Sequence, residues 1–406
     1  MAVRIWVTRS YFDGERFFES GPYTIVAEES RITLIEIGDY GTKLQARYAQ
    51  LTGAAVTVER VPFLMPGLVE GHAHLFLNGA ELDVKVRSAY LKADKDEMLA
   101  VARDSVRETY CAGVTLVRDA GDIHGINTHI KAECAGQREA PAIRSAGRAL
   151  RKVKRYGSFM ALEAADSEGI VARIDEMAPL ADDIKVLMTG IIDFKTGEMV
   201  GSPQFEIGEA QLIVNQARTY GKKTFTHCSG LDGLRIAVGA GMDSIEHGFF
   251  MTDEILQMMA EKQTAWVPTF SPVVFQRDRP ELAGWDADTV GRLSGILDNH
   301  YAHLERSYRM GVPIVAGSDA GSYGVPHGSA LIDELFHERR AGIPIEGVLA
   351  SATSIPRRVW GCESANIRVG NGVDMIALHG SPRDNMENLR CVLSVYREPV
   401  GVGAAV

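Results

Sequence analysis

The middle of the chain alternates between short apolar segments and longer segments with a helical period, and this alternation constrains the fold most strongly. Strands that are separated by helices pair in parallel, because each helix returns the chain to the starting edge of the sheet. About eight apolar segments within about 300 residues match a (β/α)8 TIM barrel. The predicted strands cover residues 63–74, 113–121, 142–150, 183–190, 223–230, 243–250, 265–270 and 313–321.

Helices are predicted between these strands from their end signals and their periodicity. The segment 94–113 begins at an aspartate and ends at a glycine, which are the start and stop signals of an α-helix. Further helices are predicted over residues 167–181, 207–221, 252–262 and 286–311.

Both ends of the chain carry short segments that alternate between apolar and polar residues, as half-buried strands do. Five such segments precede residue 61, the last of them at 54–60, and two more lie at residues 366–380 and 391–400. Asn371 and Gly372 form a pair typical of a two-residue hairpin loop. We therefore predict an α/β protein. Residues 1–60 and 362–406 are expected to form a small β-sandwich domain, and residues 61–361 the barrel.

The net charge of −10 argues against a nucleic acid or an anionic membrane as partner, because phosphate binding requires an excess of Lys and Arg. No apolar stretch approaches the roughly 18 residues that span a bilayer, and the N-terminus lacks the pattern of a secretory signal. The five cysteines form no CxxC pair, which indicates reduced thiols. We expect a cytoplasmic protein that acts on a small molecule. Assembly into a homo-oligomer is left open.

His72 and His74 end the first predicted barrel strand. Side chains at positions i and i+2 of a strand point to the same face, about 6 to 7 Å apart, so both imidazoles can reach one divalent metal ion. An isolated His-x-His motif more often consists of two histidines in an ordinary loop. The metal hypothesis therefore needs support from other strands.

Six polar side chains fall on the predicted barrel strands near their carboxyl ends: His72, His74, Lys185, His227, His247 and Asp319. In a TIM barrel these ends meet at one mouth, where the catalytic groups gather. Each residue alone has a structural explanation, since Asp319 could cap a helix and Lys185 could extend from an apolar strand. Their coincidence favours a functional site.

The chain resembles the amidohydrolase superfamily, in its branch with a two-metal centre. The stretches PGLVEGHAHL, DIKVLMTG, FTHCSG, SIEHGFF and AGSDAG carry the resemblance in the order of the family, and it covers nearly the whole chain. Within the superfamily the chain is most similar to imidazolonepropionase-like enzymes and to prolidase-like dipeptidases and carboxypeptidases. These enzymes share SIEHG and a PHG sequence after SDAG, here at residues 326–328.

The resemblance implies two divalent metal ions. The first would be held by His72, His74 and Asp319, the second by His227 and His247, and both would be bridged by Lys185 as a CO2-derived carbamate. The modification makes chemical sense, because an ammonium group has no lone pair and a carbamate offers two oxygens. A metal-bridged hydroxide would attack the scissile carbonyl, with Asp319 as the catalytic general base and acid. Zinc is the expected metal, since imidazole and carboxylate ligands suit it.

Residues for substrate binding and for ligand orientation are also predicted. Tyr156 and Arg155 lie in a loop where similar enzymes hold a substrate carboxylate, and His327 is assigned the same role. The structural alternatives are a solvated basic loop for the first two and a helix cap for His327. Asp119 and Asp122 would either orient ligand imidazoles or form Asx-turns.

The leading hypothesis is a metal-dependent amidohydrolase that cleaves a peptide-like or N-acyl amide bond of a small carboxylate-bearing substrate. One alternative is a mononuclear-metal deaminase or a cyclic-amide hydrolase. A deaminase needs a Glu as proton shuttle, and Glu246, which precedes His247 on a strand, is predicted to face away from the metal. The non-enzyme alternative is a catalytically dead barrel that serves as a binding protein. It is disfavoured because all six ligand positions are filled.

Overall fold

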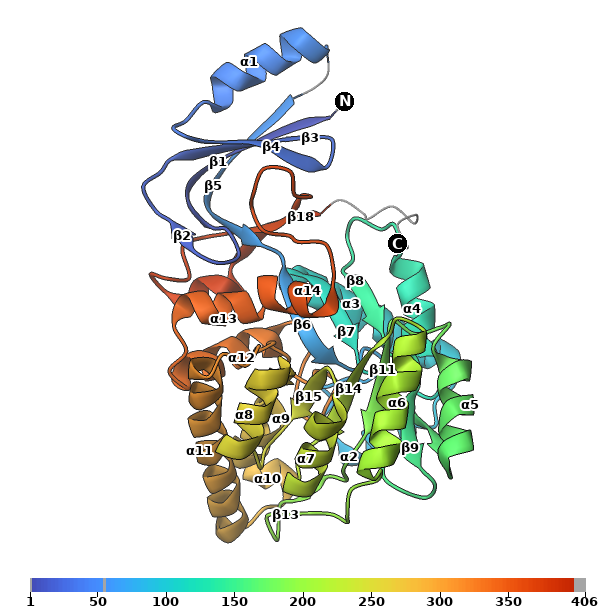
Figure 1. Cartoon of the computed structure of the whole chain (residues 1–406). Helices are drawn as coiled ribbons and strands as arrows, with labels where there is room; N and C mark the ends of the chain where they lie inside the picture. The colour runs from blue at the N-terminus through green and yellow to red at the C-terminus, as the bar shows by residue number, and fades with distance from the viewer. Residues whose placement is uncertain (1, 54–55, 398–406) are drawn as a thin grey trace.

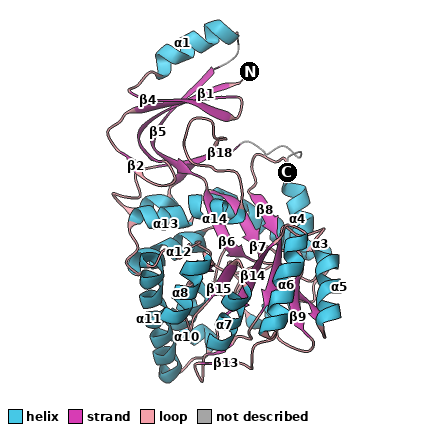
Figure 2. Cartoon of the chain, viewed as in Figure 1, coloured by secondary structure: helices cyan, strands magenta, loops and turns pink. Residues whose placement is uncertain are grey.

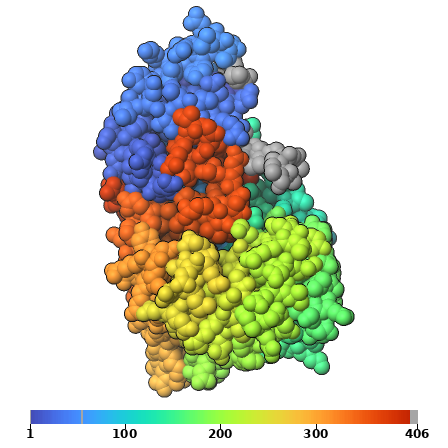
Figure 3. All heavy atoms as spheres, in the orientation of Figure 1, coloured from blue at the N-terminus to red at the C-terminus, as the bar shows by residue number. Residues whose placement is uncertain are grey.

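The computed structural model of the protein describes residues 2–53 and 56–397. The predicted strands 54–60 and 391–400 therefore extend partly outside the described residues. The molecule is elongated, with a sheet built from both ends of the chain at one end and a larger α/β body at the other (Figure 1). In the space-filling view the last part of the chain lies between the N-terminal strands and this body (Figure 3).

Strands from both ends of the chain form one seven-stranded sheet, with the order β18-β17-β5-β1-β3-β4 and with β2 paired to β1. These strands are β1 (Val3–Phe12), β2 (Phe17–Phe18), β3 (Tyr23–Glu28), β4 (Arg31–Ile37), β5 (Val56–Pro66), β17 (Asp374–Leu378) and β18 (Val392–Arg397). A single sheet thus replaces the predicted β-sandwich. One face is covered by helix α1 (Gly41–Thr52), whose Leu44 belongs to a core cluster with Ile5 and Val26.

Two details of this terminal sheet differ from the prediction. Residues 366–373 form no strand, and Gly372 makes only a single bridge to Arg31, so the Asn-Gly pair does not close a hairpin. Strand β5 continues to Pro66, so the predicted boundary after residue 60 falls inside a strand. A side chain at Gly67 would lie 2.2 Å from Oγ1 of Thr115, which explains the glycine where the chain leaves the terminal sheet for the body.

The body contains parallel sheets surrounded by helices, which confirms the α/β class (Figure 2). One sheet has the order β6-β7-β8 and the other the order β10-β9-β11-β14-β15-β16. The strands are β6 (Leu68–Ala73), β7 (Val114–Asp119), β8 (Ala142–Ser145), β9 (Ala149–Lys152), β10 (Ala161–Ala164), β11 (Asp183–Leu187), β14 (Lys223–Cys228), β15 (Ser244–His247) and β16 (Ala265–Val267). A short hairpin, β12 (Ile192–Asp193) and β13 (Glu198–Met199), follows β11.

Two predicted barrel strands are less regular than expected. The third is split into β8 and β9, which pair with β7 and β11 respectively, and Gly147 between them has φ +62°. The eighth, residues 313–321, makes only two single bridges, one to β16 through Ile314 and one to β6 through Ala320. These residues join the two sheets without regular strand pairing.

All five predicted helices are confirmed, within a few residues at each end, as α3 (Lys95–Cys111), α5 (Ser167–Met177), α6 (Ile207–Thr219), α8 (Asp253–Lys262) and α11 (Ala287–Arg309). The cap of α11 illustrates the cause, because the Asp286 carboxylate accepts the N–H of Thr289 at 2.8 Å. The other helices are α2 (Val84–Tyr90), α4 (Ile126–Cys134), α7 (Leu231–Ala240), α9 (Ser271–Asp278), α10 (Pro280–Ala283), α12 (Ser329–Arg340), α13 (Ile345–Ser351), α14 (Ser354–Trp360) and the 3-10 helix η1 (Met386–Arg390).

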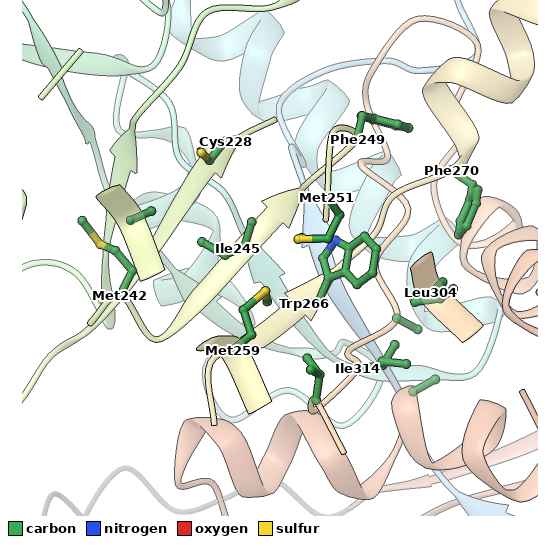
Figure 4. Packing of buried hydrophobic residues seen from close by; sticks show 14 of the residues in the cluster. Cys228, Met242, Ile245, Phe249, Met251, Met259, Trp266, Phe270, Leu304 and Ile314 are labelled. Atoms are coloured by element: carbon green, nitrogen blue, oxygen red, sulfur yellow. The ribbon is translucent and has the colours of Figure 1, made fainter. Parts of the chain in front are cut away.

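The main core lies between the second parallel sheet and the helices that cover it. In Figure 4, Met251 and Met259 lie on one side of the buried indole of Trp266, and Ile245 lies beyond them in the same cluster. The indole N–H donates to the carbonyl of His247 at 2.9 Å, so the core also fixes the end of β15. Among the described residues, no helix has the length and apolar character to cross a membrane, and all five cysteines are free.

Candidate active site

A cavity of about 840 Å³ opens at the carboxyl ends of the parallel strands. In Figure 1, α2, α10 and β13 lie at this end of the body, opposite the terminal sheet. All six residues predicted as ligands line the cavity: His72, His74, Lys185, His227, His247 and Asp319. The structure therefore brings together side chains that are up to 247 residues apart in sequence.

His72, His74 and Asp319 form the tightest group. Oδ1 of Asp319 lies 3.8 Å from Nε2 of His72 and 3.7 Å from Nε2 of His74. One potential ligand atom from each residue lies within 4.8 Å of the others, which is the spacing that a single metal ion requires. The backbone supports the arrangement, because the N–H of Asp319 donates to the carbonyl of His72 at 2.8 Å.

The other two imidazoles and the lysine lie beside this group. The rings of His227 and His247 are 4.6 Å apart between centroids, and those of His72 and His247 are 5.2 Å apart. Nζ of Lys185 lies 3.4 Å from Nε2 of His72. Lys185 is 1% exposed and has no carboxylate within ion-pairing distance among the described residues. A buried ammonium in such a place is costly.

Each imidazole is anchored through one ring nitrogen. Nδ1 of His74 contacts the carbonyl of Gly121 at 3.3 Å, and Nε2 of His227 contacts the carbonyl of Gly190 at 3.0 Å. A carbonyl only accepts hydrogen bonds, so these nitrogens carry the protons and the opposite nitrogens keep their lone pairs. Nδ1 of His247 lies 2.7 Å from Oγ1 of Thr269, a hydroxyl that can donate or accept, so this bond orients the ring without fixing its proton.

The fourth imidazole, that of His72, is anchored by Glu246. Oε2 of Glu246 lies 2.6 Å from Nδ1 of His72, and Oε1 accepts from Arg118 at 2.8 Å. The prediction that Glu246 faces away from the centre is therefore wrong. His247 has φ +69°, which breaks the alternation of side chains along the strand. The side chains of Glu246 and His247 can therefore both point inward. Glu246 does not line the cavity, so it has no access to a substrate.

Burial controls the charge state of the centre. It lowers the pKa of all four imidazoles, that of His227 to about 4, with the Lys185 charge as a further cause for each. Burial also lowers the pKa of Lys185 to about 8 and raises that of Asp319 to about 6. Neutral imidazoles with free lone pairs are the state that metal binding requires.

Backbone strain is concentrated at the same place. His247, Thr269 and Asp319 all have φ between +51° and +69°, a region that residues other than glycine seldom adopt. Each such conformation costs about 1–3 kcal/mol and is characteristic of functional sites. These backbone conformations orient the side chains of His247 and Asp319, and that of Thr269, which bonds to His247.

The predicted orienting role of Asp119 and Asp122 is not seen. Asp119 accepts the backbone N–H groups of Leu75 and Gly121 at 2.9 and 2.8 Å, and Asp122 caps the start of α4. Sequence reasoning missed Glu70, whose buried carboxylate accepts the N–H of His72 at 2.9 Å. An acidic residue inside the apolar run PGLVEG was the signal for it.

The three predicted substrate contacts lie in different places. Tyr156 lines the cavity, with its ring 5.5 Å from that of His227. Arg155 does not line it, and its guanidinium donates to the carbonyl of Ser202. His327 is buried outside the cavity wall and bonds through Nε2 to the carbonyl of Leu77 at 2.9 Å. Of the three, the structure places only Tyr156 where a substrate can reach it.

Comparison with known proteins identifies the class. The model of the amidohydrolase family matches residues 63–398, which is most of the chain. The chain therefore belongs to the amidohydrolase family, which its sequence motifs had indicated. It is a hydrolase that acts on carbon–nitrogen bonds.

Individual relatives are distant. An uncharacterized protein of Mycobacterium tuberculosis is 28% identical over 338 residues, which are 78% of this chain and 84% of that protein. Ochratoxinase of Aspergillus niger is 25% identical over 385 residues, 85% of this chain and 75% of its own. Its crystal structure superimposes with a TM-score of 0.80 at 20% identity, covering 98% of this chain and 94% of that one. A solved Xaa-Pro dipeptidase gives a TM-score of 0.82 at 22% identity, covering 98% and 100%.

The residues present fit the divalent metals that this family generally uses. The centre offers imidazole nitrogens held neutral by burial, and each of these rings is oriented by a hydrogen bond to its other nitrogen. It also offers one carboxylate between two of the rings. Such a donor set matches borderline divalent ions such as zinc.

Proposed function

We propose that the protein is a metal-dependent amidohydrolase that cleaves a peptide-like or N-acyl amide bond of a small, carboxylate-bearing molecule. The observation that carries this proposal is the convergence of four imidazoles, one lysine and one aspartate in the wall of one cavity. Neither a nucleic acid nor a membrane is part of the proposal, and the net charge of −10 supports this choice.

The proposed centre holds two divalent ions, with zinc as the expected metal. His72, His74 and Asp319 would hold one ion, and His227 and His247 the other. Lys185 would join them as a carbamate. Support for the carbamate comes from the lysine itself, because CO2 reacts with a neutral amine and burial lowers the pKa of this amine to about 8.

When bound, the metals would activate a water molecule and polarise the scissile carbonyl. The chain supplies the proton transfers and the positioning. We assign Asp319 as the general base that takes a proton from the attacking water and returns it to the leaving nitrogen. We also assign Tyr156, which lines the cavity beside His227, to substrate binding.

We further infer that the two parallel sheets make up a distorted (β/α)8 barrel, with residues 313–321 as its eighth strand. The backbone hydrogen bonds from this segment to both neighbouring strands support the inference. The division into residues 1–60 with 362–406 and residues 61–361 belongs to the same proposal, with its first boundary shifted to Gly67. Cytoplasmic location remains a prediction from the cysteine pattern.

Metal analysis of the purified protein tests the proposal. We expect about two ions per chain after loading with zinc, manganese or cobalt, together with hydrolysis of members of a panel of dipeptides, N-acyl amino acids and lactams. One ion per chain with release of ammonia from a ring amine would support the mononuclear deaminase instead. No bound metal would support a binding protein.

The variant Asp319→Asn tests the assigned base. The amide keeps the size of the side chain but cannot accept the proton, so we expect turnover to fall by at least about 100-fold while far-UV circular dichroism stays unchanged. Asp298→Asn, at an exposed position of α11 outside the cavity wall, is the matched control. Near-normal turnover of Asp319→Asn would remove Asp319 from the mechanism.

A further inference from the structure

One arginine of the cavity wall forms no ion pair within the described part of the chain, and we propose that this residue, Arg87 of α2, binds the carboxylate of the substrate. The apolar wall around it then receives a bulky, uncharged group of the same molecule. This inference rests on the proposed function and gives it a substrate class: N-acyl amino acids or similar amides that combine a free carboxylate with a large apolar substituent.

The hydrogen bonds of Arg87 go to backbone carbonyls. Its guanidinium donates to the carbonyl of Asn78 and, at 3.0 Å, to that of Gly321. Among the described residues, no carboxylate lies within ion-pairing distance, although most arginines of the chain have one. The side chain is half-buried and lines the cavity. A guanidinium with five donors, held in place by neutral carbonyls, keeps donors and charge available for an anion.

Arg87 lies close to the catalytic loop. Gly321, which accepts its hydrogen bond, is two residues beyond Asp319. A side chain at Gly321 would lie 2.5 Å from the carbonyl of His74, so this loop is in direct contact with the end of β6. The ring of Tyr323 lies 5.7 Å from the guanidinium carbon and also lines the cavity. A carboxylate bound to Arg87 would therefore lie near the scissile amide, which is attacked by the water molecule that Asp319 deprotonates.

The remaining wall is largely apolar. Its apolar members come from α2, the loop before β10, the β12 segment and α9, and they include Val86, Phe159, Ile191, Phe194 and Val273. Three apolar side chains at the rim are unusually exposed: Val86 at 49%, Leu91 at 41% and Ile191 at 48%. Exposed apolar groups around a cavity of about 840 Å³ mark a binding surface for an apolar ligand group.

Besides Asp319, two carboxylates line the cavity, and neither forms an ion pair with Arg87, although the charge of Glu81 acts on it. Oε1 of Glu81 accepts the N–H of Asp83 at 2.7 Å, which directs this charge toward the start of α2. Glu97 is exposed in the first turn of α3, where solvent screens its charge. Besides Lys185, Arg87 is the cationic side chain of this wall in the described part of the chain.

Paired substrates test the inference. We would compare N-benzoyl-L-phenylalanine with its C-terminal carboxamide, using the zinc-loaded full-length enzyme. We expect the wild type to prefer the acid in kcat/KM by about 10- to 100-fold, the range for a charge-assisted hydrogen bond. Arg87→Met should reduce this ratio to about 1, mainly through KM, and Arg87→Lys should retain part of it. Arg235→Met, on the outer helix α7, is the matched control and should keep the full ratio.

The ratio separates recognition from folding, because a loss of stability or metal affects both substrates equally. Calorimetry on metal-free enzyme with the same pair measures the preference without turnover. Equal hydrolysis of acid and amide by the wild type, or an unchanged ratio in Arg87→Met, would overturn the inference and leave the proposed function intact. Failure of the wild type on the entire amide panel would overturn the proposed function itself.

Discussion

At the scale of single residues, the centre is defined by how each polar group is anchored. Every imidazole has one nitrogen bound to a group of the chain, so its second nitrogen is directed by the fold. Lys185 differs, since among the described residues its only polar contact is the 3.4 Å approach of Nζ to Nε2 of His72. A buried amine without an anionic partner is destabilising as an ammonium, and formation of a carbamate would remove that cost.

This difference makes Lys185→Ala informative. We expect the substitution to reduce metal content and activity together, because it removes the proposed bridge, and we expect uptake of metal by the wild type to fall when loading is done without bicarbonate. Elemental analysis measures both effects. Lys222→Ala, which removes a lysine bound to the carbonyl of Ala181 outside the site, is the control. Full metal content and full activity in Lys185→Ala would exclude the bridging role.

The sequence predicted the ligand candidates better than the groups around them. Strand ends are readable from periodicity, and six polar residues at strand ends converge in any barrel. The direction of Glu246 was not readable, because it depends on the positive φ of the next residue. Arg155 and His327 lie outside the cavity wall, where their side chains bond to the carbonyls of Ser202 and Leu77. Loop geometry of this kind leaves no periodic signal.

At the scale of elements, β15 shows how one strand serves both the core and the site. Ser244 and Glu246 bond to each other on the inner side, whereas Ile245 is packed among the helices. Apolar runs between helical segments predicted the strands of the body, and end signals predicted the helices. The break at Gly147 and the loose eighth strand were not predictable, because an apolar run reads the same whether or not its hydrogen bonds are continuous.

Substitutions at Ile245 test the packing of this strand. Ile245→Ala leaves a cavity beside Trp266, so we expect the free energy of unfolding to fall by about 2–5 kcal/mol, and Ile245→Val should lose about 0.5–1.5 kcal/mol. Urea unfolding of metal-free protein measures both. Leu393→Ala in β18, where the side chain is 50% exposed, should cost clearly less than Ile245→Ala. Comparable losses at both positions would argue against this core.

At the scale of the whole molecule, buried histidines make the free energy of unfolding depend on pH. Seven of the eleven histidines have pKa values lowered chiefly by burial: His72, His74, His227, His247, His300, His327 and His337. The unfolded chain binds protons at these positions near pH 6.5, whereas the folded chain binds them only at lower pH. These histidines therefore contribute less stability as the pH falls below 6.5, whereas buried carboxylates with raised pKa values, such as Glu70 and Asp119 at about 7, contribute more.

For the metal-free protein we expect each such histidine to remove up to about 1.4 kcal/mol of stability per pH unit between pH 6.5 and about pH 4, measured as the difference between the wild type and a variant that lacks it. Urea midpoints at pH 7.5, 6.0 and 5.0 measure the trend. His300→Phe, in a ring-lined pocket outside the site, should flatten the dependence by the share of one histidine. The same pH dependence in His300→Phe and in the wild type would contradict the burial of the His300 imidazole in neutral form.

The placement of the cavity has a practical side. Its mouth lies at the end of the body opposite the terminal sheet, and the chain begins in the first strand of that sheet (Figure 1). An affinity handle or a covalent tether fused ahead of Val3 would project from the far pole of the molecule. The enzyme could thus be fixed to a support by its amino end with its entrance facing the surrounding liquid.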